Sequence, residues 1–263
     1  MRPYEIKVEE FSYNPPNSLK GVLHNISFEV RAGEFVSLVG RNGQGKTSII
    51  QAIAGELDTQ YTTGKIQVGT TTVTRPINQI IKGVGVVHQF VQDDLIPELS
   101  IANNIKLRQL FGNNGKYKHS NKNSEWNAHT NQQLADKVGD KDFKVDLSTL
   151  VKTLSGGQRQ LLNVLMALDF EHSNYGCQLL LLDEPLTGLD IWIQKQVVKL
   201  IDELTINSST EERATTIVMV THDLQLALNF SDKVFIVNDG KVSEFVTKGS
   251  ENWKVEHLEK ALL

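Results

Sequence analysis

Residues Gly40–Thr47 read Gly-Arg-Asn-Gly-Gln-Gly-Lys-Thr, and this stretch decides the fold class. The mainly apolar segment Glu34–Val39 precedes it as a predicted strand, and Lys46–Ala54 follows as a predicted helix that ends at a glycine. A strand that turns through glycines into a helix leaves backbone N–H groups in a concave nest, and the helix N-terminus adds partial positive charge. The stretch therefore predicts a polyphosphate site, with Lys46 as a cation for the β- and γ-phosphates and Thr47 as a hydroxyl ligand for Mg²⁺.

A run of four leucines, Leu179–Leu182, predicts a fully buried strand of a parallel sheet. Two carboxylates, Asp183 and Glu184, follow at its C-terminal end, which is where open α/β sheets place their ligand sites. A solvated acidic turn is the alternative, but the leucines should end this strand inside the domain, beside the glycine loop. We therefore expect Asp183 to hold Mg²⁺ through its water shell.

A second anion site is predicted at Leu154–Gln158, which reads Leu-Ser-Gly-Gly-Gln. Ser155 is suited to cap a helix that the two glycines open, and Leu161, Leu165 and Leu168 would give this helix a buried face. The N-terminus of a helix favours an anion. One chain would thus carry two sites for a γ-phosphate, although it needs only one.

Along the chain the motifs run in the order Gly40–Thr47, Leu154–Gln158, Leu179–Glu184 and Thr221-His222-Asp223. In these residues and this order the chain is similar to the ATP-binding subunits of ABC (ATP-binding cassette) transporters. The resemblance runs from about Tyr4 to about Lys248. It implies ATP hydrolysis by a P-loop NTPase core. It also implies a head-to-tail homodimer, in which the two kinds of phosphate site, one from each subunit, bind the same ATP.

In such a dimer, Ser155 and Gly157 of one subunit would close over ATP that Lys46 of the other subunit holds. The segment Leu186–Asp190 resembles the one that crosses the dimer interface in the family.

Three catalytic roles rest on this resemblance together with position. Glu184 is expected to polarise the water that attacks the γ-phosphate. Gln89, which follows the predicted strand Val84–Val87, is expected to contact Mg²⁺ and that water. His222 is expected to hydrogen-bond the γ-phosphate as the family's switch histidine, whereas His88 is expected to be structural.

Tyr13 lies upstream of the glycine loop at the family's usual distance for the aromatic residue that stacks on adenine, and Phe11 is its rival. The residues expected to contact nucleotide are Tyr13, Gly40, Arg41, Asn42, Gly43, Gln44, Gly45, Lys46, Thr47, Ser48, Ser155, Gly156, Gly157 and Gln158. The expected catalytic residues are Lys46, Gln89, Glu184 and His222, and the expected metal ligands are Thr47, Gln89 and Asp183.

The patterning along the chain predicts an α/β fold with a mostly parallel sheet in its P-loop core and an antiparallel β region near the N-terminus. Core residues are expected at 1–88 and 175–263, with a helical subdomain inserted at about 89–174. The polar segment Gly112–Gln133 is predicted to be a solvated loop or insertion in the helical subdomain, and a partner surface is the less supported alternative. The further expected strands are Tyr4–Val8, Ile26–Val30, Gly64–Val68, Thr215–Val220, and Val234–Val237 with Lys241–Val246 as a hairpin around Asp239-Gly240. A short helix is expected at Leu224–Phe230, and the absence of an internal repeat predicts a single cassette.

Composition narrows the function further. The 263 residues carry a net charge of -4, so no overall basic field attracts nucleic acid. A single cysteine fits a reducing compartment. The longest apolar runs are a few residues, whereas a membrane span needs about 20. We therefore expect a peripheral protein on the cytoplasmic face of the membrane, working through a partner that spans it.

The leading hypothesis is the Mg²⁺-dependent ATPase subunit of a membrane transporter, with a transmembrane permease and a second copy of the ATPase as partners. The segments Gly83–Val87 and Leu154–Gln158, with Gln89, resemble ATPases of uptake systems that use an extracytoplasmic solute-binding protein, some of which handle amino acids. The alternative is a soluble ABC ATPase without a membrane partner. A simple nucleotide-binding regulator is disfavoured by the complete set of hydrolytic residues.

Overall fold

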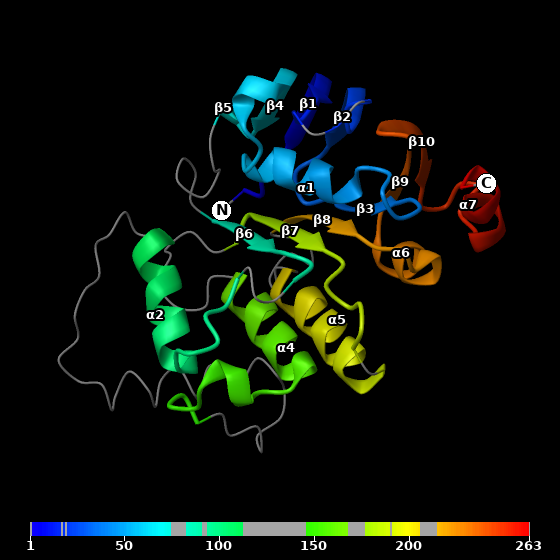
Figure 1. Cartoon of the computed structure of the whole chain (residues 1–263). Coiled ribbons are helices and arrows are strands. Elements are labelled where there is room, and N and C mark those ends of the chain that lie inside the picture. The colour runs from blue at the N-terminus through cyan, green and yellow to red at the C-terminus, as the bar shows by residue number, and fades with distance from the viewer. Residues whose placement is uncertain are drawn as a thin grey trace.

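The computed structural model describes residues 2–16, 18, 20–74, 83–90, 94–112, 146–167, 177–189, 191–205 and 215–262. Within them, a four-stranded sheet and a six-stranded sheet are stacked with helices between and below them (Figure 1). The smaller sheet has the order β2-β1-β4-β5 and is antiparallel. Its strands are β1 (Ile6–Tyr13), β2 (Leu23–Val30), β4 (Thr62–Val68) and β5 (Thr71–Thr72).

The first two strands are longer than the sequence pattern predicts. Strand β1 continues to Tyr13 because its pairing with β2 shifts between Val8 and Phe11, where Glu10 adopts a positive φ of 48°. The shift returns Phe11 to the buried side, although Glu9 and Glu10 interrupt the alternation of apolar and polar residues. Strand β2 begins before its predicted start in the same way, with Asn25 at a φ of 51°.

The larger sheet has the order β10-β9-β3-β8-β7-β6 and carries the phosphate-binding elements. Its strands are β3 (Phe35–Val39), β6 (Val84–Val87), β7 (Leu179–Asp183), β8 (Thr216–Val220), β9 (Lys233–Asn238) and β10 (Lys241–Thr247). All neighbouring pairs are parallel except the hairpin β9–β10, which turns at Asp239 and Gly240. The mostly parallel sheet and the hairpin are thus confirmed.

Helix α1 (Lys46–Ala54) lies between the two sheets (Figure 1). Its Ile49, Ile50 and Ile53 side chains are buried in a core that also takes side chains from both sheets. Gly55 ends the helix with a φ of 72°, as expected for a C-terminal glycine, and its N–H bonds to the carbonyl groups of the last turn. The strand β7 is buried on both faces because Leu179 and Leu181 join this core, whereas Leu180 and Leu182 pack on the opposite side.

Helices α4 (Gly156–Ala167) and α5 (Ile191–Thr205) cover that opposite face (Figure 1). The α4 side chains Leu161 and Leu165 pack with Ile193, Val197 and other apolar groups of α5 and the sheet. Helix α2 (Ile101–Gly112) and the 3₁₀ turn Val151–Thr153 complete the described part of the helical region. The boundaries 89–174 stay a prediction, and all but one residue of the segment Gly112–Gln133 falls outside the described residues.

Helix α6 (Leu224–Phe230) has its predicted bounds, and Asp223 caps it through a hydrogen bond from the Leu226 N–H. A further helix, α7 (Val255–Ala261), packs Leu258 against β9, β10 and α6. A 3₁₀ turn, Thr59–Tyr61, leads into β4. Among the described helices, none has the length and apolar character needed to cross a membrane.

Candidate functional site

The glycine loop leaves the C-terminal end of β3 and enters α1, so it forms the predicted nest. Gly40 must be a glycine because a Cβ there would collide with the Val237 carbonyl oxygen. Gly45 has a φ of 95° and precedes α1 without a side-chain cap. The first N–H groups of α1 are therefore left for a ligand, and the helix N-terminus faces an anion-binding position.

Lys46 is nearly buried, with 5% of its surface exposed. Its Nζ donates hydrogen bonds to the carbonyl oxygens of Gly40 and Arg41, each at 2.9 Å. Burial lowers the pKa of Lys46, and the nearby Glu184 and Asp183 carboxylates partly offset that effect. The glycine loop thus holds the Lys46 side chain against two of its own carbonyl groups. A bound phosphate would replace those carbonyl oxygens as the hydrogen-bond acceptors of Nζ.

Asp183 ends β7 beside the glycine loop, with 2% of its surface exposed. Burial raises the pKa of Asp183, and a hydrogen bond with the Thr47 side chain and the charge of Lys46 act against that rise. Its Oδ1 atom is buried and has no hydrogen-bond partner among the described residues. An unpartnered carboxylate oxygen next to a threonine hydroxyl fits Mg²⁺, which prefers oxygen ligands and keeps several waters.

Glu184 adopts a left-handed backbone conformation, with a φ of 47°. Its Oε2 accepts hydrogen bonds from the Thr187 hydroxyl at 2.7 Å and contacts His222 Nδ1 at 3.0 Å. If Glu184 is ionised, Nδ1 must carry the proton. Strain of this kind persists where the surrounding structure over-determines it, and the two side-chain contacts fix the carboxylate toward the loop. The sequence analysis placed Thr187 only in the segment expected to cross the dimer interface and did not foresee its contact with Glu184.

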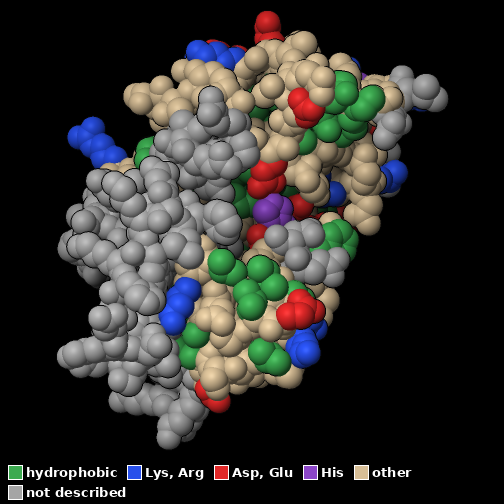
Figure 2. Space-filling model, turned by 60° about the vertical axis from the view of Figure 1, so that its left-hand side comes forward, with side chains coloured by type: hydrophobic (Ala, Val, Ile, Leu, Met, Phe, Trp, Pro, Cys, Tyr) green, Lys and Arg blue, Asp and Glu red, His purple; other side chains and the backbone are tan. Residues whose placement is uncertain are grey.

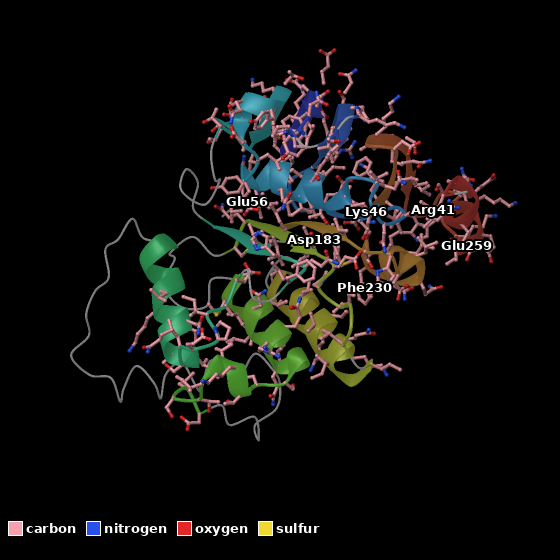
Figure 3. All side chains as sticks on the ribbon, viewed as in Figure 1. Arg41, Lys46, Glu56, Asp183, Phe230 and Glu259 are labelled. Atoms are coloured by element: carbon pink, nitrogen blue, oxygen red, sulfur yellow. The ribbon has the colours of Figure 1, made fainter. Side chains whose placement is uncertain are left out.

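A cleft of about 900 Å³ brings the glycine loop, Lys46 and Glu184 together, whereas the buried Asp183 does not belong to its lining. The lining includes most of the predicted residues, and also Val22, Thr187 and Leu262, which the sequence analysis did not place in the nucleotide site. The predicted residues that line it are Gly40, Arg41, Asn42, Gly43, Gly45, Lys46, Thr47, Ser48, Gln89, Glu184 and His222. Figure 3 shows Lys46 close to Asp183 in projection and Arg41 on the side of α7.

Several predicted nucleotide contacts are absent from this lining. The Gln44 side chain instead accepts a hydrogen bond from the Asp239 N–H at the β9–β10 turn. Tyr13 is partly buried and adjoins the cleft through Val22, whose N–H bonds to the Tyr13 carbonyl oxygen at 2.8 Å. Phe11 is 7% exposed and belongs to the core, so it is a poor candidate for stacking on a base.

The Leu-Ser-Gly-Gly-Gln segment forms a capped helix start but does not line the cleft. The Gln158 N–H donates to Ser155 Oγ at 3.2 Å, and the Ser155 N–H donates to Gln158 Oε1 at 3.0 Å. This reciprocal pair is a capping box. Ser155 and Gly156 are exposed, and a Cβ at Gly156 would meet open space. Within one chain, therefore, the two predicted phosphate sites are separate.

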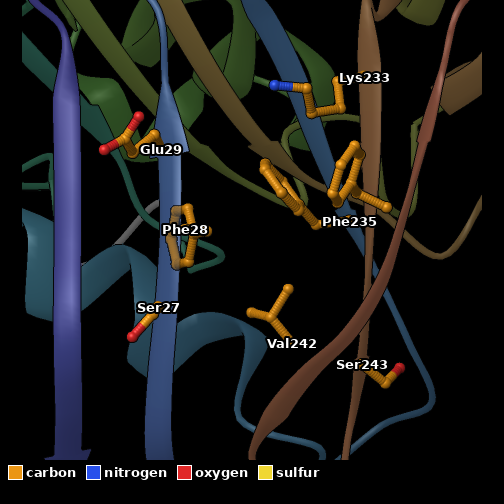
Figure 4. A pocket seen from close by; sticks show the side chains of 8 residues that line it. Ser27, Phe28, Glu29, Lys233, Phe235, Val242 and Ser243 are labelled. Carbon is orange, nitrogen blue, oxygen red and sulfur yellow. The ribbon is translucent and has the colours of Figure 1, made fainter.

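A second cavity, of about 330 Å³, lies between β2 and the β9–β10 hairpin (Figure 4). Phe28 and Phe235 face each other across it, with ring centroids 5.1 Å apart. Lys233 points into the same region, but its Nζ already pairs with Glu34 at 3.0 Å. We assign this cavity no ligand.

The fold and the cleft define a nucleotide-binding protein of the P-loop class. A family model described as "ABC transporter" matches residues 23–187, and the chain belongs to that family. A "Tyrosine transport ATP-binding protein" of Clostridioides difficile (strain R20291) is 30% identical over 94% of this chain and 91% of that protein. The "Ribose import ATP-binding protein RbsA" of Bacillus subtilis (strain 168) is 31% identical over 86% of this chain, which spans 43% of that protein.

The fold also matches a dimeric, post-hydrolysis structure of the ATP-binding cassette MJ0796 bound to ADP and Pi. The TM-score is 0.72 at 22% identity, over 93% of this chain and 99% of the other. The predicted α/β class, with a P-loop core and an antiparallel N-terminal region, is thereby confirmed. The chain is an ATP-binding subunit of the ABC ATPase family.

The stacking role of Tyr13 stays a prediction, and it is testable. Tyr13→Ala should weaken ATP binding by about 1–2 kcal/mol, the scale of base–aromatic stacking, because the flat ring is lost. Tyr13→Phe keeps the ring and should bind ATP nearly as the wild type does. Isothermal titration calorimetry measures both affinities. An unchanged affinity in Tyr13→Ala would remove Tyr13 from the nucleotide site.

Proposed function

We propose that this protein is the Mg²⁺-dependent ATPase subunit of a membrane uptake transporter, in which ATP-driven closure of a head-to-tail dimer supplies the mechanical work. The observation that carries the proposal is the meeting of Lys46, Glu184 and His222 in one cleft at the end of the parallel sheet. Gln89 lines the same cleft. A cation, a carboxylate and a histidine beside a phosphate nest are the groups that phosphoryl transfer to water requires.

The chemistry follows from the positions of these side chains. Lys46 would exchange the carbonyl groups of its own loop for the β- and γ-phosphates. Glu184, fixed by Thr187 and His222, would accept the proton of the attacking water, and His222 would then also contact the γ-phosphate. Bound by Thr47, Asp183 and Gln89, Mg²⁺ would neutralise charge on the phosphate oxygens.

Dimerisation is proposed because a single chain leaves one phosphate site incomplete. Ser155 caps α4 and Gly157 lies in its first turn. Neither residue lines the cleft that contains Lys46, and Ser155 is exposed. A second copy, turned head to tail, would bring these groups over the γ-phosphate. Leu189 is followed by Asp190, which falls outside the described residues, so the proposed crossing segment is described only in part.

A membrane partner is proposed from exposed apolar side chains in and beside the helical region. Phe90, Ile96 and Leu150 are 58%, 46% and 38% exposed. Figure 2 shows hydrophobic side chains gathered on the lower part of one face of the molecule. Uptake and a peripheral position on the cytoplasmic face are proposed because the relatives are named for tyrosine transport and ribose import. A solute-binding protein outside the membrane would complete such a system, and no nucleic-acid partner is proposed.

The transport role is tested by co-expression with the product of a neighbouring gene that encodes several apolar spans of about 20 residues. Stable co-purification, together with solute-stimulated ATPase activity in proteoliposomes, would support it. If no such gene exists and the isolated protein turns over at full rate alone, the alternative of a soluble ABC ATPase is favoured.

The metal requirement gives a further prediction. Turnover should stop in excess EDTA and return when Mg²⁺ is added, because the buried Asp183 Oδ1 lacks another partner among the described residues. Asp183→Asn should raise the Mg²⁺ concentration that gives half-maximal turnover, since the ion loses one negative charge. A coupled phosphate-release assay over a Mg²⁺ series measures both effects. Undiminished turnover in EDTA would contradict the proposed metal site.

A further inference from the structure

His88 lies between two carboxylates that come from different parts of the chain. Its Nδ1 is 2.7 Å from Asp94 Oδ1, and its Nε2 is 3.0 Å from Glu56 Oε2. Both ring nitrogens therefore face acceptors, which favours the doubly protonated ring. The ring thus joins two carboxylate side chains that are far apart in the sequence.

Asp94 extends this chain of contacts to helix α4. Its Oδ2 accepts a hydrogen bond from Asn163 Nδ2 at 2.7 Å and another from the His88 backbone N–H at 2.8 Å. Asn163 is fully buried within α4, the helix that begins with Gly156. Its Oδ1 has no partner among the described residues, so the amide is held through the hydrogen bond from its Nδ2 to Asp94.

At its other end the chain of contacts reaches helix α1. Glu56 follows Gly55, the residue that ends α1, and α1 begins with Lys46. The series Glu56–His88–Asp94–Asn163 thus connects the two helices whose N-termini form the two predicted phosphate sites. Figure 3 shows Glu56 above β6.

Gln89 follows His88 directly and lines the nucleotide cleft. Because Asp94 binds both the ring and the backbone N–H of His88, it fixes the main chain immediately before Gln89. A change in the orientation of α4 would move Asn163 and Asp94. Asp94 would in turn shift His88, and with it the main chain that leads into Gln89.

We propose that His88 is a positioning residue for ATP hydrolysis, which couples the orientation of α4 to the position of Gln89 in the cleft through Asp94 and Glu56. This inference rests on the proposed role of Gln89 in hydrolysis. The sequence predicts only a structural His88, and a simple structural tie is the competing explanation. A structural tie would stabilise the fold, whereas a positioning residue would affect turnover more than nucleotide binding.

Two substitutions separate the contacts of the ring. An asparagine amide mimics Nδ1 of histidine and can keep the bond to Asp94, whereas a glutamine amide mimics Nε2 and can keep the bond to Glu56. His88→Asn and His88→Gln should each lower kcat by roughly tenfold or more, because both contacts act in series and small displacements cost much turnover. The KM for ATP and the ATP affinity should stay within about threefold of the wild type.

A double-mutant cycle tests the series directly, because Glu56 and Asn163 are linked through His88 and Asp94. Glu56→Gln and Asn163→Leu should each lower kcat, and the double variant should be no worse than the more impaired single variant. Asp94→Asn replaces Asn163→Leu in the cycle if the latter does not fold. Glu251→Gln changes an exposed carboxylate outside the series and should match the wild type. Losses that multiply in the double variant would overturn the coupling.

Gln89→Ala separates failure of this inference from failure of the proposed function. If Gln89→Ala keeps wild-type kcat, the proposed role of Gln89 fails and the inference falls with it. If Gln89→Ala is impaired while both His88 variants turn over normally, the inference alone is overturned. A fall in melting temperature with unchanged kcat in the His88 variants would identify the structural tie.

Discussion

Glu184→Gln is expected to stop steady-state ATP hydrolysis while leaving ATP binding intact. Removal of a general base typically costs about 10²–10⁴-fold in rate. Binding should survive because the groups that face the phosphates, the loop N–H groups and Lys46, are unchanged. The glutamine can still accept a hydrogen bond from Thr187, so the left-handed turn at Glu184 should keep its geometry.

The same variant should dimerise only when ATP is present. ATP that is bound but not hydrolysed would stay between Lys46 of one copy and Ser155 of the other, and would hold them together. Without nucleotide the facing surfaces should associate weakly, since both line sites built for anions. Size-exclusion chromatography with light scattering, with and without ATP, measures the mass.

Ser155→Arg added to Glu184→Gln should abolish that dimer, because it places a bulky side chain in the proposed interface. Ser250→Arg, at an exposed serine outside the cleft, is the matched control and should leave the dimer intact. A Glu184→Gln protein that binds ATP but stays monomeric at tens of micromolar would show that the isolated subunit does not form the head-to-tail dimer. A membrane partner would then be needed to bring the two copies together.

Lys46→Ala should remove most ATPase activity and also weaken ATP binding. The loss of a positioned donor at developing negative charge typically costs about 10²–10³-fold in turnover. Unlike Glu184, Lys46 faces the ground-state triphosphate as well, so affinity should fall with turnover. A phosphate-release assay and a fluorescent ATP analogue measure the two effects, and circular dichroism checks the fold.

Lys65→Ala provides the control, because Lys65 is an exposed lysine on β4 outside the cleft. It should match the wild type in both assays. Wild-type turnover in folded Lys46→Ala would reject Gly40–Thr47 as the phosphate-binding loop of a hydrolysing site.

Local spacing was enough to predict the elements that form the glycine nest. The glycines of Gly40–Gly45 and the helix that ends at Gly55 are local backbone features, so the loop and α1 follow from neighbouring residues alone. Four consecutive leucines likewise required a strand buried on both faces, which placed Asp183 and Glu184 at the carboxyl end of that strand. These predictions needed no knowledge of what packs against what.

The shift in β1 illustrates why other features were beyond the sequence. Glu9 and Glu10 interrupt the alternation, and only the pairing with β2 decides that Phe11 turns back into the core. Because Phe11 is buried, it is a poor alternative to Tyr13 for stacking on adenine. That burial follows from strand pairing and not from the composition of the segment. The support of Glu184 by Thr187 depends in the same way on a left-handed turn.

By itself, the sequence predicted the chemical groups of the candidate site: a glycine nest, a lysine, two carboxylates and a histidine, each recognised from residues close together in the chain. Tertiary structure alone decided which distant groups meet. It brought Val22 and Leu262 to the cleft, kept Ser155 out of it, and joined Glu56, His88, Asp94 and Asn163 across two helices. The physical reason is that turns and helix starts depend on local backbone preferences, whereas contacts between distant side chains depend on how whole elements pack.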